Sequence, residues 1–412
     1  MASGVYQTKL HIDKPITIEG PADRSATIEG DRSGRTIAVH APDVTLRNLT
    51  VTRSGMSLPA MDAGIYLEET APRALIEHNN ILDNSVGVYL HGSADAMVRE
   101  NKIVGDATLR VNERGNGVTV WNAPGAQVVG NDISKGRDGI FSNTSTHNTY
   151  KNNRFSDLRF AVHYMYTNDS EISGNISVGN NMGYVLMFSE RLKVFDNIAV
   201  GSRDQGIMLN YVNYSDIHDN IINKAGKCVF AYNANYDKLS ANHFENCQIG
   251  IHFTAAIEGT SLHDNSFINN ESQVKYVSTR FLDWSEGGHG NYLERQQCVR
   301  FERRRLRRQR VPAQRHHRPN HLARARIAPL DEQSRHQHRQ MGAGAVSRRF
   351  ARRRGGQQTA DEALCPQNSN PLSGDEGRVA QRSRNAAVGM GQGGKRVFEL
   401  VCFRRHPDSN AV

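Results

Sequence analysis

Histidine and methionine side chains recur at positions from which they could bind a soft metal ion. Met165 and Met187 lie 22 residues apart, and His163 precedes Met165 by two residues. Thioether and imidazole ligands together suit copper, and methionine favours Cu(I). The candidate copper ligands are His163, Met165, Met187, Met208 and His252. The alternative is that these methionines fill gaps beneath a loop or a partner protein, because the sequence has no close-set His/Cys motif.

Asparagine recurs at intervals that can place these side chains next to one another. The steps are 22 or 23 residues along the series Asn131, Asn153, Asn175, Asn197, Asn220, Asn242 and Asn265. A fixed period of about 20 to 50 residues is typical of a solenoid, and asparagine amides can bridge successive coils as a ladder. The register extends upstream through Asn101 and Asn80. The longer step between Asn101 and Asn131 indicates a loop inserted in one coil.

Each repeat contains three short β-rich segments and no helical periodicity. One segment follows the asparagine, a second is usually introduced by glycine, and a third precedes the next asparagine. We therefore expect an all-β fold, a right-handed single-stranded parallel β-helix with about 22 residues per coil.

The second strand of each coil carries an unusual outer face. The first and third residues after the glycine position are mostly aliphatic, as in Ile65 and Leu67 or Ile207 and Leu209, so the second and fourth residues face outward. Outward positions on a solvated face should be polar, and an apolar stripe across successive coils indicates a covered or binding surface. The predicted partner surface consists of Tyr89, His91, Trp121, Phe141, Phe230 and Tyr232.

Charge divides the chain into two parts. Residues 1–292 mix acidic and basic side chains, and we expect them to form β-helix repeats of the kind found in carbohydrate-binding proteins and sugar hydrolases. Arginine-rich runs follow at 301–310 and 352–354, and the net charge of the whole chain is +9. A basic tail suggests nucleic-acid binding. However, residues 293–305 can be written in synonymous codons that, when read one base later, encode an ordinary continuation of the protein. Two later stretches give the same result in the same shifted frame. We therefore predict that residues 293–412 are out of frame, disordered and without a role in binding nucleic acid.

Cysteine usage and the chain start bear on the compartment. Cys228 and Cys247 are one coil apart but offset by about three residues, so we expect buried thiols rather than a disulfide or a metal site. The other three cysteines, Cys298, Cys365 and Cys402, lie in the arginine-rich part. No run of 18 apolar residues predicts a membrane span. The start carries no secretory signal, and we expect upstream residues to be missing.

Enzymatic action on acidic polysaccharides is the competing interpretation, because β-helices often perform it. Such enzymes need carboxylates beside a basic residue. The outward stripe offers only Glu68, while Arg137-Asp138 and Arg203-Asp204 are expected to be ion pairs in turns, and Asp169 lies in a turn of its own. A polysaccharide-binding or polysaccharide-modifying protein, of the lyase or uronate epimerase type, therefore stays the alternative, and we expect no enzyme activity.

Several segments resemble the NosD family over roughly residues 15 to 292. The most specific are Arg159-Phe160-Ala161-Val162-His163-Tyr164-Met165-Tyr166, Gly183-Tyr184-Val185-Leu186-Met187-Phe188-Ser189 and Gly250-Ile251-His252-Phe253-Thr254-Ala255. The resemblance implies a periplasmic accessory protein for maturation of the copper sites of nitrous oxide reductase in denitrification. It also implies an ABC transporter, with an ATPase and a membrane subunit, and a copper chaperone as partners. Two family features are absent here, the signal peptide and an in-frame C-terminal segment expected to help dock the membrane subunit.

Overall fold

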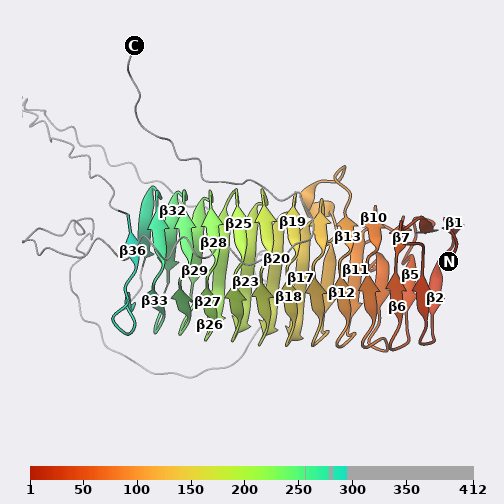
Figure 1. Ribbon diagram of the computed structural model, residues 1–412, viewed down its shortest axis with the longest axis horizontal. Helices are drawn as coiled ribbons and strands as arrows, with labels where there is room; N and C mark the ends of the chain where they lie inside the picture. Colours follow the sequence, from red (N-terminus) through yellow and green to blue (C-terminus); the bar gives the residue numbers. More distant parts are fainter. Residues whose placement is uncertain (256, 278–281, 295–412) are drawn as a thin grey trace, which may run out of the picture. The chain divides into compact units, whose positions relative to one another are not determined.

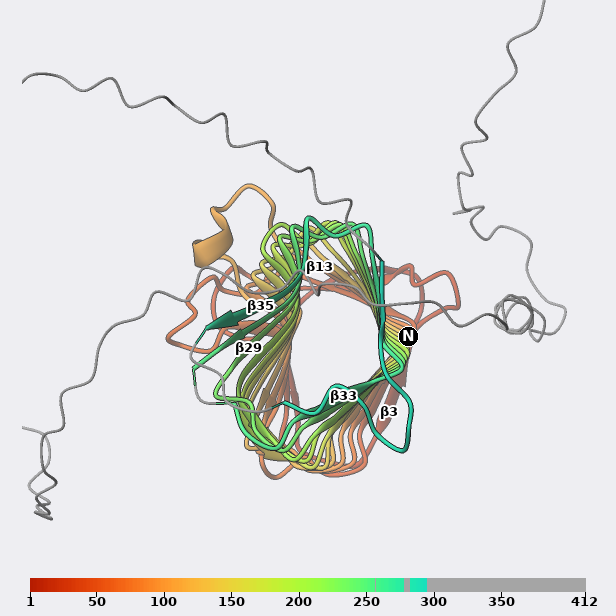
Figure 2. The same cartoon turned by 90° about the vertical axis from the view of Figure 1, so that its left-hand side faces the viewer.

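The computed structural model describes residues 1–255, 257–277 and 282–294, which form a parallel β-solenoid of three sheets (Figure 1). Every strand pairing within these sheets is parallel, and each strand pairs with strands one coil away. Seen along its axis, the chain winds around a single core enclosed by the three sheets (Figure 2). The expected three-stranded repeat is confirmed.

The strands of the first sheet, sheet A, follow the asparagine positions. They are β1 (Gly4–Gln7), β4 (Ala26–Glu29), β7 (Leu49–Thr52), β10 (Asn80–Leu82), β13 (Lys102–Val104), β16 (Asp132–Ser134), β19 (Arg154–Ser156), β22 (Ile176–Val178), β25 (Ile198–Val200), β28 (Ile221–Asn223), β31 (His243–Glu245), β34 (Ser266–Ile268) and β36 (Tyr292–Leu293).

Sheet B contains the longer strands that the glycine positions introduce. They are β2 (Leu10–Ile12), β5 (Ile37–Val39), β8 (Ala63–Leu67), β11 (Val86–His91), β14 (Val118–Trp121), β17 (Asp138–Thr146), β20 (Phe160–Asn168), β23 (Met182–Glu190), β26 (Gln205–Asn213), β29 (Lys227–Tyr232), β32 (Ile249–Thr254) and β35 (Ser272–Val277).

Sheet C completes each coil before the next asparagine. Its strands are β3 (Thr17–Glu19), β6 (Thr45–Arg47), β9 (Leu75–Glu77), β12 (Met97–Arg99), β15 (Gln127–Val129), β18 (Thr149–Lys151), β21 (Glu171–Ser173), β24 (Lys193–Phe195), β27 (Asp216–His218), β30 (Lys238–Ser240) and β33 (Ser261–His263).

The short strands can be stable because each places a side chain in the common core. The central residue of β15, Val128, and that of β16, Ile133, are fully buried, as are Ile172 and Val194 in the same positions of later coils. Strand alternation sends the flanking side chains outward. Each of these strands thus buries one side chain in the core, and the large side chains of Phe155 and other aromatic residues fill the interior.

A continuous amide ladder joins the coils at the turn between sheets C and A. Asn153 donates from its backbone N and its Nδ2 to Asn175 Oδ1, at 2.9 and 3.0 Å, and its Nδ2 also donates to the Val128 carbonyl at 2.8 Å. The same pattern continues to Asn291, whose Oδ1 accepts from Asn265. Burial leaves no solvent to replace these bonds, so each rung ties three coils together.

The first rung lies one residue earlier than the sequence register predicts. Asn79, not Asn80, is fully buried and donates to Asn101 Oδ1 at 2.9 Å from its backbone N. The residue before each rung from Asn101 to Asn265 adopts a left-handed conformation, and His78 (φ 55°) has it ahead of Asn79. The side chain of Asn80 instead accepts a bond from Arg24 at 2.9 Å. Two adjacent asparagines made the register ambiguous, and the left-handed turn residue decides it.

The expected insertion between Asn101 and Asn131 is confirmed as a loop that follows β13. It contains the one-turn 3-10 helix η1 (Val111–Glu113). Arg114 closes the loop by donating to the carbonyls of Leu109 and Ala107, at 2.9 and 3.0 Å.

The prediction of free thiols at Cys228 and Cys247 is wrong, because the two form a disulfide with a Cα–Cα distance of 5.7 Å. Cys228 occupies the position that glycine holds in the neighbouring coils, as at Gly250. A Cβ added to Gly250 would point at the Asn270 side chain, 3.2 Å away, which is the corner position of the next coil. Cys247 occupies that corner position relative to Cys228, so the offset of the pair brings the two Cβ atoms together.

The arginine-rich part and the proposed change of reading frame lie outside the described residues, apart from Leu293 and Glu294 at its start.

The paired asparagines at the first rung give a direct test of the ladder. Asn79→Ala would leave the Leu49 amide and the Leu46 carbonyl without the bonds that Asn79 supplies. We expect a loss of about 2 to 4 kcal/mol in the free energy of unfolding, measured by urea denaturation. The matched control is Asn80→Ala, for which we expect a loss below about 1 kcal/mol. Equal losses in the two variants would contradict the assignment of the ladder.

Candidate functional site

The outward side chains of sheet B form two parallel columns along the solenoid axis. Strand register places each residue beside its counterpart one coil away. The first column is Tyr66, Tyr89, Thr119, Phe141, His163, Val185, Met208, Phe230, His252 and Lys275. The second column is His91, Trp121, Asn143, Met165, Met187, Asn210, Tyr232 and Thr254.

Four of the five predicted copper ligands are contiguous in these columns. Met165 lies directly opposite Met187 on adjacent strands. His163 is two residues before Met165 on β20, and Met208 lies diagonally across from Met187, beside Val185. We call His163, Met165, Met187 and Met208 the His/Met patch. The three methionines are partly buried, whereas His163 is 8% exposed.

The fifth predicted ligand, His252, lies apart from the patch. The register places it two strands beyond Met208 and four beyond His163. At a strand spacing of about 4.8 Å, these separations are about 10 and 19 Å. One metal ion therefore cannot bind His163 and His252 together.

A buried carboxylate orients His163. Asp138, the first residue of β17, is 1% exposed and accepts from Arg159 Nε at 2.8 Å and from Arg159 Nη2 at 2.6 Å. Its Oδ2 also lies 3.0 Å from His163 Nδ1. Burial alone would raise the pKa of Asp138, but the hydrogen bonds from His163 and Arg159 and the charge of Arg159 outweigh it, so this pKa is lowered.

The other ring nitrogen of His163 has the opposite surroundings. His163 Nε2 is buried and has no hydrogen-bond partner within the described part of the chain. The Phe141 ring lies 5.0 Å away and the Phe160 ring meets His163 edge-on at 5.2 Å. A polar atom buried without a partner is rare and marks a position that a ligand can fill.

The expected Arg137–Asp138 pair is wrong, because Asp138 pairs with Arg159 of the following coil. The side chains of Arg137 and Asp138 alternate in direction, whereas the next coil brings Arg159 over the Asp138 carboxylate. The Arg159 guanidinium lies 4.2 Å from the centre of the Phe160 ring. The expected Arg203–Asp204 pair is present at 3.0 Å. The expectation for Asp169 needs one addition, since this turn residue pairs with Arg191 at 2.6 Å.

The predicted partner surface divides into two groups. Toward the N-terminal end, His91 stacks on Trp121 with 4.5 Å between ring centroids, and Tyr89 lies 5.3 Å from Tyr66. Tyr66 is 2% exposed beneath Arg35, so the first column is covered there. Trp121 is 39% exposed. The other predicted surface residues are half-buried, namely Tyr89, His91, Phe141, Phe230 and Tyr232.

An aromatic stack beside the methionines was not predicted. Tyr166, Phe188 and Tyr211 each follow a residue of the second column and stack on one another at 5.2 Å. Tyr211 also meets Tyr232 edge-on at 5.6 Å. The stacked faces contact each other, so ring edges rather than faces are left to solvent. The signal in the sequence was an aromatic residue at every coil directly after Met165, Met187 and Asn210.

These three aromatic residues have positive φ angles of 52°, 50° and 53°. Bulky side chains rarely adopt this conformation, and its cost is typically about 1 to 3 kcal/mol per residue. Tyr166 and Tyr211 remain 53% and 41% exposed.

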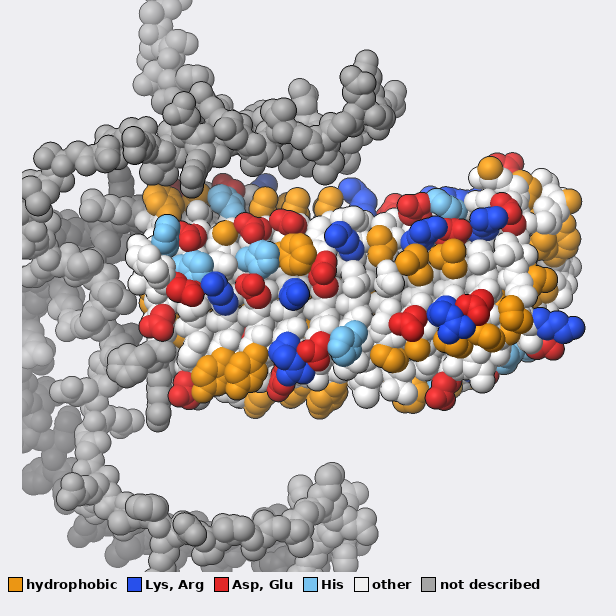
Figure 3. Space-filling model, turned by 60° about the horizontal axis from the view of Figure 1, so that its bottom comes forward, with side chains coloured by type: hydrophobic (Ala, Val, Ile, Leu, Met, Phe, Trp, Pro, Cys, Tyr) orange, Lys and Arg blue, Asp and Glu red, His pale blue; other side chains and the backbone are white. Residues whose placement is uncertain are grey.

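Hydrophobic side chains also gather along the lower margin of the face in Figure 3, while charged side chains are interspersed over its middle.

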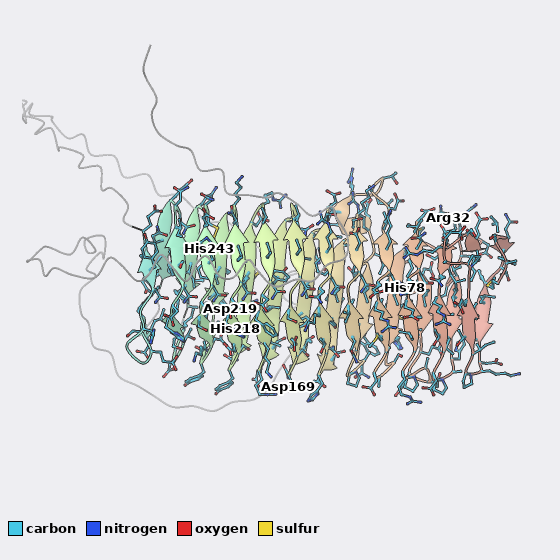
Figure 4. The ribbon with its side chains drawn as sticks, in the orientation of Figure 1. Arg32, His78, Asp169, His218, Asp219 and His243 are labelled. Carbon is cyan, nitrogen blue, oxygen red and sulfur yellow. A yellow bond between two sulfur atoms is a disulfide. The ribbon has the colours of Figure 1, made fainter. Side chains whose placement is uncertain are left out.

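Several other histidines are each paired with a neighbouring carboxylate. His218 and Asp219, labelled together in Figure 4, are 2.8 Å apart, and His243 lies 3.3 Å from Glu245. His78 likewise contacts Glu100 at 3.0 Å. Within residues 1–255, 257–277 and 282–294, no group of three or more His, Cys, Asp and Glu side chains is arranged to hold a metal ion.

The fold and the outer face of sheet B define a parallel β-solenoid whose exterior is suited to binding. A relative from Stutzerimonas stutzeri, named "Probable ABC transporter binding protein NosD", is 34% identical over 307 residues, which cover 71% of this chain and 70% of that protein. A relative of the same name from Pseudomonas aeruginosa is 33% identical over 306 residues, covering 71% of each chain. Residues 99–297 match the family described as "Periplasmic copper-binding protein (NosD)". The chain belongs to the NosD family.

Solved structures with the same fold include carbohydrate-active enzymes. The A-module of a mannuronan C-5 epimerase from Azotobacter vinelandii has a TM-score of 0.53 at 12% identity, covering 72% of this chain and 90% of that one. A family 28 exopolygalacturonase from Yersinia enterocolitica also has a TM-score of 0.53, at 8% identity, covering 68% and 71%. At these identities the likeness shows the fold alone. Within the described residues, no helix is long and apolar enough to cross a membrane.

The surroundings of His252 predict its titration. Burial, followed by the charges of Lys227 and Lys275, lowers its pKa from the ordinary value of 6.5. Because the folded state binds this proton less readily than the unfolded state, His252 contributes stability above pH 6.5 that is lost as the pH falls through the lowered pKa.

We expect NMR titration to give His252 a midpoint below 6.5, and Lys275→Met to move the midpoint upward. Lys151→Met, on sheet C, is the control and should leave the midpoint unchanged. A midpoint at or above 6.5 in the unaltered protein would contradict this electrostatic account.

Proposed function

We propose that this chain is an accessory protein in the maturation of the copper sites of nitrous oxide reductase, and that it carries Cu(I) at the His/Met patch. The observation that carries the proposal is that His163, whose buried Nε2 has no hydrogen-bond partner within the described residues, lies two residues from Met165 on β20, and that Met165 lies opposite Met187 on β23. Soft thioethers with one imidazole fit Cu(I) better than Zn²⁺ or hard cations. The copper is cargo, and we propose no catalytic step.

The family supports the general setting of this role. Its description is periplasmic and copper-binding, and the relatives are named as ABC transporter binding proteins. The Cys228–Cys247 disulfide fits an oxidising compartment. We propose as partners the ATPase and membrane subunit of such a transporter, a copper chaperone and nitrous oxide reductase itself.

The half-buried aromatic residues would provide the partner-facing surface around the patch. Trp121 and Phe141 lie on the N-terminal side of the patch, and Phe230 and Tyr232 on the other. A docked chaperone or reductase would contact these rings while the copper passes between the partner's own copper ligands and the methionines of the His/Met patch. His252, beside Phe230, would then belong to the contact surface rather than to the patch.

The polysaccharide-modifying alternative draws on no specific observation here. Glu68, the carboxylate nearest the stripe, pairs with Arg35 at 3.4 Å and with His40 at 2.8 Å. Asp138 is occupied by Arg159 and His163. Neither carboxylate is placed to act as a general acid or base on a sugar.

Competition for Cu(I) tests the proposed site. Apo protein, titrated anaerobically against a chromophoric Cu(I) chelator, should withdraw one equivalent of Cu(I). The double variant Met165→Ala with Met187→Ala should bind at least about tenfold more weakly, because thioether donors are lost. Met97→Ala, a partly buried methionine of sheet C, is the matched control. Equal competition by the double variant and the unaltered protein would remove the patch from the proposal.

A further inference from the structure

A three-residue relay, Arg159 to Asp138 to His163, leads from the turn before β20 to the His/Met patch. Arg159 donates both Nε and Nη2 to the two oxygens of Asp138, at 2.8 and 2.6 Å. Asp138 Oδ2 lies 3.0 Å from His163 Nδ1. Asp138 is 1% exposed and His163 is 8% exposed, so water has little access to either.

Hydrogen-bonding capacity fixes which nitrogen of His163 carries the proton. An ionised carboxylate can only accept, so the proton of the Asp138–His163 bond must be on Nδ1. A proton on Nε2 would be a buried donor without a partner. The neutral imidazole of His163 therefore carries its proton on Nδ1.

We propose that Asp138 and Arg159 are positioning residues that hold His163 in its Nδ1–H tautomer, so that Nε2 presents a lone pair to a soft metal cation. The ligand half of this inference rests on the proposed function, whereas the tautomer half does not. Many metal-bound histidines are oriented in this way by donating their distal ring N–H to a carboxylate. The Phe141 and Phe160 rings on either side of the imidazole limit its rotation.

One carboxylate oxygen serves both partners, because Asp138 Oδ2 accepts from Arg159 Nη2 and lies 3.0 Å from His163 Nδ1. The relay therefore makes a specific prediction for Asp138→Leu, which removes both acceptor oxygens at similar size. Nδ1 then has no acceptor for its proton, so we expect the proton to move to Nε2, which removes the lone pair from the patch.

The conservative variant Asp138→Asn should retain the tautomer. Its amide oxygen, placed where Oδ2 lies now, can accept from Arg159 Nη2 and from His163 Nδ1–H together. Asparagine carries no negative charge, so loss of the tautomer in Asp138→Leu but not in Asp138→Asn is expected if the acceptor oxygen, rather than the charge, positions the proton.

Nitrogen NMR on the full chain with ¹⁵N-labelled histidine measures the tautomer without copper, and His163→Gln assigns the signals. We expect Nδ1–H in the unaltered protein and in Asp138→Asn, and Nε2–H in Asp138→Leu. Asp204→Asn is the control, since Asp204 pairs with Arg203, and it should leave His163 unchanged. An Nε2–H tautomer in the unaltered protein, or no change in Asp138→Leu at an unaltered melting temperature, would overturn the inference.

Cu(I) competition on the same proteins separates this inference from the proposed function. We expect Asp138→Leu to bind Cu(I) at least about tenfold more weakly than Asp138→Asn. If the tautomer switches as expected but no variant and no unaltered protein binds Cu(I), the relay stands and the copper proposal fails. If Cu(I) binds equally well whichever tautomer is present, the assignment of Nε2 as a ligand is overturned.

Discussion

The amide ladder between coils is the interaction on which the rest of the structure depends. Each rung, such as Asn153 on Asn175, satisfies a backbone amide, a side-chain amide and a carbonyl that would otherwise be buried without partners. Because the bonds run from coil to coil, they fix the stacking register as well as the turn. From β14 to β35, the paired residues of sheet B thereby acquire defined neighbours 22 or 23 positions away.

That register is what turns isolated side chains into a surface with chemistry. Met165 and Met187 are distant in sequence but directly opposed across two strands. His163 stands beside them with one nitrogen bound to Asp138 and the other unpartnered. The strands that carry the patch and its neighbour, β17, β20, β23 and β26, are each 9 residues long, longer than the other strands of sheet B. A binding site on such strands can be more precise than one on loops.

Much of this arrangement could be predicted from the sequence, because the same pattern of strands and turns recurs in every coil of a solenoid. The spacing of the asparagines gave the coil length, and strand alternation then separated core from exterior, including the pairing of Met165 with Met187. The prediction failed where a side chain contacts a residue of the neighbouring coil that is out of register with it. Asp138 meets Arg159 rather than its chain neighbour, and Cys228 reaches Cys247 through a position that glycine otherwise holds. Side-chain direction at a corner, which spacing does not specify, decides both cases.

X-ray absorption at the copper edge of the Cu(I)-loaded protein tests the central claim most directly. The account predicts two sulfur neighbours and one imidazole nitrogen around the copper, with loss of the nitrogen in His163→Gln and loss of sulfur in the variant lacking Met165 and Met187. A copper environment without sulfur, or one that none of these substitutions changes, would contradict it.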